Sequence, residues 1–328
     1  MTGSFKRNNP SNHFFLILYG LMLYWPIFMH PAPALRGSDE TLLYQQLLDV
    51  LTWIFGKHLL EFPILIFLLT YMQSLVLNHI ASTQRLFQRP NFLVGMCYWL
   101  FSAAFFQEQG FGPVVLMITL MVWVLHQVNH FQTTQTPGRT LYNTGLLLGV
   151  ALLLDHTSFV FIFLPMIGLT IMRPFRLQEW FIALLGVLTP IYLQVGGMFI
   201  KYGHLQQLEL DLKFEWPDWN LSLMENMHLA LLLLVTLIGF FYVQSNRMKE
   251  LVQARNSWSV MLATGLLSMF FLLFDGEETH RSLSVLMPVM AFFGAAAFYY
   301  VDRGWFRTLM HLALLGMAMT QGFFFAFR

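Results

Sequence analysis

Two adjacent acids, Asp39 and Glu40, follow Gly37-Ser38 after the first long apolar block of the chain. A carboxylate at this place could act as a general base that takes the proton of a sugar or lipid hydroxyl. The same residue types also begin helices, because Ser38 or Asp39 can cap a first turn and acids there suit the helix dipole. The sequence leaves both roles, catalysis and capping, open for this pair.

Asp155 and His156 lie between two short apolar blocks, 141–154 and 157–172. An ionisable residue close to membrane depth is a functional candidate. If the two blocks are separate spans joined by a tight turn, Asp155 instead lies at the surface and caps the next helix. Three further ionisable residues lie at the start of other long apolar blocks: Glu61, His280 and Arg281. We expect them on the same side of the membrane as Asp155.

Two histidines, His126 and His130, are four residues apart and would share one helical face, a spacing that can chelate a metal. A third ligand is not identifiable, although His79 could approach from another block. Polar residues at a membrane interface are the simpler interpretation, so no metal site is assigned. The sequence shows no motif for a cofactor. The one metal that it suggests is a divalent ion bound by acids such as Asp39 and Glu40.

Membrane helices must position these residues. The chain of 328 residues is 57% hydrophobic and 11% charged, with a mean hydropathy of +0.59, whereas soluble domains carry about 25% charged residues. Its apolar blocks of roughly 16–22 residues have the length of membrane-crossing helices. We therefore expect an all-α polytopic membrane bundle that forms one domain over 1–328. Eleven spans are predicted, centred near residues 21, 70, 99, 120, 148, 164, 190, 236, 265, 290 and 317.

Charge sets the predicted orientation. With Lys6 and Arg7 inside, 12 of the 18 basic residues fall on the inner side, whereas 14 of the 17 acids fall on the outer side. Because basic residues concentrate in cytoplasmic connections, the N-terminus is predicted inside and the C-terminus outside. The expected location is the bacterial inner (cytoplasmic) membrane, in contact with its lipids.

Two outer connections have patterns of their own. In 40–55 the apolar residues recur at helical spacing, which predicts an amphipathic helix on the outer leaflet. In 208–216 apolar and charged residues alternate strictly, which is typical of a short strand with one apolar face. A lone strand must pair or be covered, so this segment could dock envelope proteins.

Several classes of protein are excluded or unsupported. A net charge of +1 without a basic run argues against nucleic-acid binding. The glycine-rich and catalytic motifs of nucleotide-binding proteins and hydrolases are absent. The single cysteine, Cys97, excludes an intramolecular disulfide. Gly145 and Gly149, four residues apart, predict close helix packing.

The middle of the chain resembles DUF6427, an uncharacterised family of multi-pass membrane proteins of the Bacteroidota. The similar stretches are LVLNHIASTQRLFQRPNFL (75–93), LYNTGLLLGVALLL (141–154) and RPFRLQEWFIALLGVLTPIY (173–192). The family implies a multi-pass fold and carries no established activity.

A more distant resemblance is to GT-C membrane glycosyltransferases, which use polyprenyl-phosphate-linked donors on the outer face. It covers GSDETLLYQQLL (37–48), TGLLLGVALLLDHTSFVFIFLPMIGLTIMRPF (144–175) and HRSLSVLMPVMAFFGAAAFYY (280–300). Carried over to this chain, the resemblance implies that Asp39 or Glu40 is the catalytic base and that Arg281 contacts the donor phosphate.

The leading hypothesis is therefore a GT-C-like transferase. It predicts that Asp39, Glu40 and Arg281 converge at the mouth of one groove. The main alternative is a non-catalytic membrane subunit that docks partner proteins through 208–216, and a transporter is third. The other substrate-binding candidates are His280, Asp155, His156 and Glu61.

Overall fold

The protein's structure is a computed structural model that describes residues 2–6, 9, 11–34, 41–55, 60–132, 137–203, 221–274 and 279–326. Every regular element in these ranges is helical, which confirms the all-α class. The elements are α1 (Thr2–Phe5), α2 (Ser11–Met29), α3 (Leu42–Phe55), α4 (Glu61–Thr83), α5 (Leu93–Gln109), α6 (Pro113–Asn129), α7 (Pro137–Leu154), the 3₁₀ helix η1 (His156–Ile162), α8 (Phe163–Met172), α9 (Leu177–Tyr202), α10 (Leu223–Asn246), the 3₁₀ helix η2 (Arg247–Lys249), α11 (Val252–Phe271), α12 (Thr279–Tyr300) and α13 (Gly304–Ala326).

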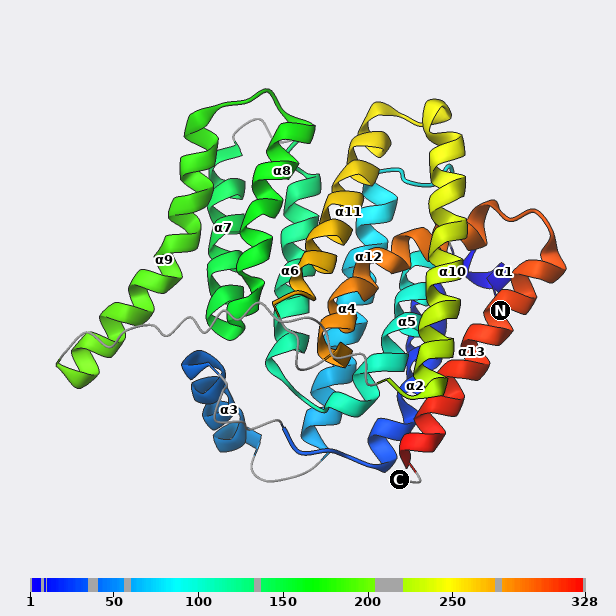
Figure 1. The fold of residues 1–328 in the computed structure, drawn as a ribbon, viewed down its shortest axis with the longest axis horizontal. Helices are drawn as coiled ribbons and strands as arrows, with labels where there is room; N and C mark the ends of the chain where they lie inside the picture. Colours follow the sequence, from blue (N-terminus) through cyan, green and yellow to red (C-terminus); the bar gives the residue numbers. More distant parts are fainter. Residues whose placement is uncertain are drawn as a thin grey trace.

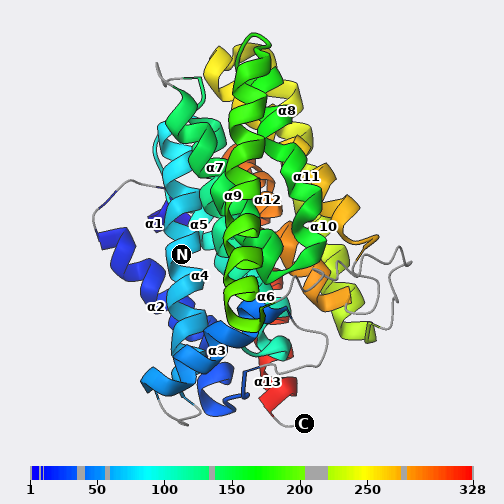
Figure 2. The ribbon, with the colours of Figure 1, turned by 90° about the vertical axis from the view of Figure 1, so that its left-hand side faces the viewer.

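The long helices lie side by side in one bundle, and α3 lies at one end of it (Figure 1). The α8–α9 and α10–α11 connections lie at the other end. Figure 2 keeps this arrangement after a quarter turn. We call the two ends the α3 end and the opposite end.

All eleven predicted span centres fall within helices. Among the described residues, five helices are long and apolar enough to cross a membrane: Ser11–Met29, Glu61–Thr83, Leu177–Lys201, Leu223–Lys249 and Arg281–Tyr300. Three further apolar helical stretches are shorter: Leu93–Ala103, Pro113–Asn129 and His156–Met172. The chain thus has the helices of a membrane-embedded protein, and the count of eleven crossings stays a prediction.

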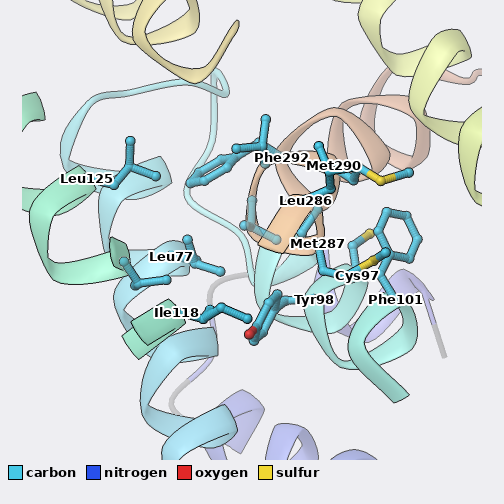
Figure 3. Packing of buried hydrophobic residues seen from close by; sticks show 14 of the residues in the cluster. Leu77, Cys97, Tyr98, Phe101, Ile118, Leu125, Leu286, Met287, Met290 and Phe292 are labelled. Carbon is cyan, nitrogen blue, oxygen red and sulfur yellow. The ribbon is translucent and has the colours of Figure 1, made fainter. Parts of the chain in front are cut away.

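The centre of the bundle is the contact between α5 and α12. Every residue from 282 to 298 in α12 is buried, and so is Cys97 of α5. Figure 3 shows Cys97, Tyr98 and Phe101 beside Leu286, Met287 and Met290 of α12. Gly294 permits the close approach, because a Cβ there would lie 2.5 Å from the Phe101 ring.

Helices α7 and α9 approach each other through glycines. A Cβ at Gly145 would overlap the Ala183 carbonyl oxygen, and one at Gly186 would overlap the carbonyl oxygen of Tyr142. The Tyr142 hydroxyl lies 3.0 Å from that of Thr189 in α9. The predicted packing role of the Gly145 and Gly149 pair is therefore confirmed.

The predicted helix at 40–55 is present as α3, with residue 40 outside the described residues. It turns Tyr44 and Leu48, both fully buried, onto the bundle. Val50, Trp53 and Ile54 are exposed instead. The apolar spacing in 40–55 predicted the helix, but it did not identify Tyr44 and Leu48 as the residues that make the protein contact. The predicted strand at 208–216 lies outside the described residues.

Candidate functional site

Two residues predicted separately, Asp155 and Arg281, form one ion pair. The Arg281 Nη2 atom lies 2.7 Å from the Asp155 Oδ2 atom and donates a hydrogen bond to it. Asp155 follows the last residue of α7, whereas Arg281 lies in the first turn of α12. The bundle therefore brings together two of the predicted site residues that are 126 positions apart.

The Asp155 side chain has a second role, as the cap of η1. Its Oδ1 atom accepts a hydrogen bond from the Thr157 backbone N–H at 3.0 Å, and its backbone is extended, as a capping residue requires. The predicted tight turn is thus confirmed. The capping role that the sequence offered for Asp155 is therefore confirmed, and its carboxylate is covered by protein, because only 2% of its side chain is exposed. Arg281 covers the carboxylate and keeps 23% of its own side chain exposed.

Thr41 ties the start of α3 to this site. Its hydroxyl donates a hydrogen bond to the Leu154 carbonyl at 3.1 Å, one residue before Asp155. The same oxygen accepts from the Tyr44 backbone N–H at 3.4 Å, the contact of an N-cap residue. Sequence reasoning offered Ser38 or Asp39 as this cap, and the described capping contact comes from Thr41 instead.

Tyr44 provides a second contact between α3 and the bundle. The Tyr44 hydroxyl donates a hydrogen bond to the Phe111 carbonyl at 2.9 Å, in the connection that precedes α6. Thus Thr41 and Tyr44 fix α3 to the end of α7 and to the α5–α6 connection. The chain position that follows Glu40 is therefore fixed beside the ion pair.

The remaining predicted residues are distributed as follows. Asp39 and Glu40 lie outside the described residues, as does the side chain of His280. His156 is half-buried as the first residue of η1. Glu61 is the first residue of α4, where its charge suits the helix dipole. Among the described contacts, none joins Glu61 to the ion pair.

A small apolar cavity of about 20 Å³ lies between α6, η1, α11 and α12. Val285 and Pro288 line it and share a helical face with Arg281, since they follow at four and seven positions. Phe161 of η1 closes it on another side. The lining of the cavity thus begins about one helical turn from Arg281 along α12, and we call the apolar contact around this cavity the apolar seam.

The predicted histidine cluster lies toward the opposite end. The His126 ring centroid is 4.4 Å from that of His130 and 5.5 Å from that of His79, so the anticipated approach of His79 occurs. The His130 Nδ1 atom lies 2.8 Å from the His126 carbonyl oxygen. Within the described part of the chain, no three His, Cys, Asp or Glu side chains are arranged to hold a metal.

Buried polar side chains are a feature that sequence reasoning missed. In the middle of the bundle Tyr98 donates a hydrogen bond to Gln73, whose Nε2 donates to Thr119 at 2.6 Å and to the Val115 carbonyl at 3.2 Å. A glutamine inside an apolar block was the available signal. These contacts join α4, α5 and α6, so they specify helix register.

No protein-family model matches the chain, and no curated protein shows significant similarity to it. The resemblances to DUF6427 and to GT-C enzymes therefore stay predictions. Any functional inference must come from the geometry around Asp155 and Arg281.

Proposed function

We propose that the protein is a GT-C-like membrane transferase that uses a polyprenyl-phosphate-linked sugar at the α3 end. The observation that supports it is the Asp155–Arg281 pair, in which a buried carboxylate holds a partly exposed guanidinium near the apolar seam. A lipid-linked sugar phosphate presents the matching chemistry, an anionic group joined to an apolar tail.

Arg281 is the proposed contact to the donor phosphate. A guanidinium has five N–H donors in a planar fork, so it can bond to Asp155 through one nitrogen and to phosphate oxygens through others. Asp155 orients this fork and balances its charge while the donor is absent. The low dielectric near the buried carboxylate strengthens both interactions.

Asp39 or Glu40 is the proposed base. Thr41, the residue that follows this pair in the sequence, donates its hydroxyl to the carbonyl of the residue before Asp155. This connectivity supports the predicted convergence of residues 39 and 40 with Arg281. It also accounts for the tether of α3 by Tyr44, since a base needs a fixed distance from the reacting carbon.

The proposed reaction is the transfer of a sugar to a hydroxyl acceptor. The carboxylate removes the acceptor proton as the hydroxyl oxygen attacks the anomeric carbon, and the bond between that carbon and the phosphate oxygen breaks. Polyprenyl phosphate leaves with the bonding electrons, and Arg281 stabilises the negative charge on it. A divalent metal held by the acids would supply further charge stabilisation.

The apolar seam is the proposed path of the polyprenyl tail. Its cavity of about 20 Å³ is smaller than one isoprene unit, so the proposal requires α6 and α11 to separate when the donor enters. Thr264 and Ser268 line the seam, and each donates its hydroxyl to a carbonyl of its own helix. Their polar groups are therefore satisfied without water.

The expected orientation places the α3 end outside the bacterial inner membrane. Arg85, Arg173 and Arg247 lie in connections at the opposite end, which agrees with a cytoplasmic location of that end. Lipid-linked sugars are used on the outer side by the enzymes that this chain resembles. Topology and reaction are thus mutually consistent.

The two alternative functions have less support. The docking segment 208–216 lies outside the described residues. Of the described acids, Asp155 and Glu179 are buried. Glu179 lies in the first turn of α9, where its Oε2 atom is 3.6 Å from the Arg173 Nε atom. A transporter would need ionisable residues along a midplane path, and the described residues place these two acids at helix ends.

The test is an in vitro transfer assay with the full chain in liposomes and a panel of polyprenyl-phosphate sugars. Asp39→Asn, Glu40→Gln and Arg281→Lys are compared with Glu61→Gln, a carboxylate change at the same end without a described contact to the pair. We expect Arg281→Lys and at least one of the two acid variants to lower kcat by about 100-fold or more, with Glu61→Gln near the parent. Full activity in Arg281→Lys and Arg281→Gln would refute the proposal.

A further inference from the structure

A charged cavity of about 460 Å³ lies at the opposite end of the bundle. The α4–α5 connection, the α10–α11 connection and the end of α12 form its walls. Three cationic side chains, Arg85, Arg89 and Lys249, line it with one acid, Glu250. All three cations are exposed, so they are accessible to a ligand. This volume is within the range of small-molecule sites.

The backbone at Arg85 is unusual. Arg85 has a φ of 52°, and it is the one non-glycine residue of the described chain in the left-handed region. Its N–H donates to the Ser82 carbonyl at 3.3 Å, and the Leu86 N–H donates to that of Ala81 at 3.0 Å. These bonds form a Schellman motif at the end of α4, whose left-handed position is normally glycine.

The arginine at this position therefore costs stability. A side chain in the left-handed region is strained, and glycine would relieve that strain. Strain that persists in a well-held backbone points to a role for the side chain. The Arg85 side chain lines the cavity, so a ligand in the cavity supplies such a role.

The backbones that carry both arginines are fixed by hydrogen bonds. Buried Gln84, which precedes Arg85, accepts from Gln253 at 2.9 Å and from Ser257 at 3.3 Å, so the end of α4 is joined to α11. The Asn91 side chain donates to the Arg89 carbonyl and accepts from the Leu93 N–H, each at 3.1 Å. The backbone positions of both arginines are thus fixed before any ligand binds.

Glu250 is the remaining charged group of the cavity. The Tyr300 hydroxyl donates to its Oε1 atom at 3.4 Å, whereas Oε2 is buried without a hydrogen-bond partner among the described residues. Burial raises the pKa of this carboxyl above its ordinary value, although Tyr300, Trp258 and Arg247 oppose the rise. A carboxyl that is more readily protonated repels an anion less and can donate a hydrogen bond to it.

We propose that this cavity binds a phosphate-bearing anion between Arg85, Arg89 and Lys249. Two arginines and a lysine around a concave site are the groups that bind phosphate oxygens. The site is separate from the Asp155–Arg281 pair, so it does not depend on the transferase proposal. Its phosphate belongs either to the headgroup of an anionic phospholipid or to a soluble phosphate ester.

The test uses the full chain in nanodiscs. In one arm, phosphatidylcholine discs with and without phosphatidylglycerol are compared by thermal unfolding and by native mass spectrometry of retained lipid. In the other arm, glycerol 3-phosphate is titrated into pure phosphatidylcholine discs. A response to the lipid alone identifies a headgroup site, and a response to glycerol 3-phosphate identifies a site open to soluble esters. Either supports the proposal.

The variants separate binding from structure. Arg85→Gly should keep or raise the Tm in pure phosphatidylcholine, because it removes strain, yet weaken binding of the effective probe roughly tenfold through the lost charge-assisted hydrogen bond. Arg85→Gln keeps the strained backbone and should weaken binding equally. Arg139→Gln removes an exposed charge of α7 outside the cavity and should bind as the parent does.

Three results would overturn the proposal. The first is no response of the parent to either probe. The second is parental binding by both Arg85 variants. The third is an equal loss in Arg139→Gln, because binding would then reflect the overall charge of this end.

Discussion

The Asp155–Arg281 pair predicts strongly non-additive effects on stability. Asp155→Asn removes the negative charge and keeps an oxygen that can accept from the Thr157 N–H, so the cap of η1 survives. Arg281→Met removes the positive charge and keeps an unbranched apolar side chain. The two single variants and the double variant form a cycle that isolates the pair.

The exposed fractions of the two side chains set the magnitudes. Removing one partner of a fully buried pair costs about 3–5 kcal/mol. Arg281 keeps 23% of its side chain exposed, so its charge stays partly hydrated, and we expect Asp155→Asn to cost about 2 kcal/mol. Asp155 keeps 2%, so Arg281→Met should cost about 3–4 kcal/mol.

The double variant should lose less stability than the two single variants lose together. It leaves no unpaired charge, and replacing a buried pair with neutral groups is often close to neutral. We expect a cost of about 2 kcal/mol for the double variant and therefore a coupling energy of about 3–4 kcal/mol. The measurement is reversible unfolding in detergent micelles, followed by tryptophan fluorescence.

Single effects that add to within about 0.5 kcal/mol would refute this account of the pair, because independent sites behave in that way. Transfer activity of the same proteins gives a second readout. The double variant should fold and stay inactive, since Arg281 is the proposed phosphate contact. An active double variant would mean that the pair has only a structural role.

Three further predictions concern other parts of the chain. Gly186→Ala should destabilise the protein by about 1–3 kcal/mol in thermal unfolding, because its Cβ would overlap the Tyr142 carbonyl. The control is Gly197→Ala on the same helix, whose Cβ would meet open space and should not destabilise the protein. Equal effects of the two variants would contradict the close packing of α7 and α9. The raised pKa of Glu250 means that the folded state binds this proton more tightly than the unfolded state, so its stabilising contribution is present at low pH and is lost as the pH rises through the folded pKa. The measurement is Tm as a function of pH, beginning near the ordinary carboxyl pKa of 4.5. Glu250→Gln should remove the decrease in Tm that accompanies deprotonation of Glu250. The same pH dependence in the parent and the variant would exclude this contribution of Glu250. Reporter fusions after Arg89 and Arg255 should read cytoplasmic and one after Trp219 exported, and an exported signal after Arg255 would overturn the orientation.

Helices and their close packing could be predicted because they depend on local patterns. Apolar blocks of membrane-crossing length placed every predicted centre inside a helix, and the spacing of Gly145 and Gly149 indicated a helix contact that the structure contains. The tight turn after 141–154 was likewise visible. In each case the decisive residues are neighbours in sequence.

Features set by tertiary contact could not be predicted in the same way. Asp155 and Arg281 were each identified, but their pairing depends on how α7 and α12 are placed in the bundle. The protein-facing side of α3 was missed because Tyr44 is fixed by a carbonyl in a distant connection. The left-handed backbone of Arg85 was missed because sequence patterns assign that conformation to glycine.

The contact between α5 and α12 has a consequence for biogenesis. Phe101 packs against Gly294, which the ribosome adds about 190 residues later, a delay of roughly 10–40 s at ordinary rates of synthesis. During this interval α5 is covered on one face by α2, whose Gly20 accommodates the Trp99 ring. The other face of α5 must wait for α12, in which every residue from 282 to 298 is buried in the final state. A chain truncated before α12 would lack the partner that covers Phe101, so we expect it to leave this face of α5 without its native protein contact.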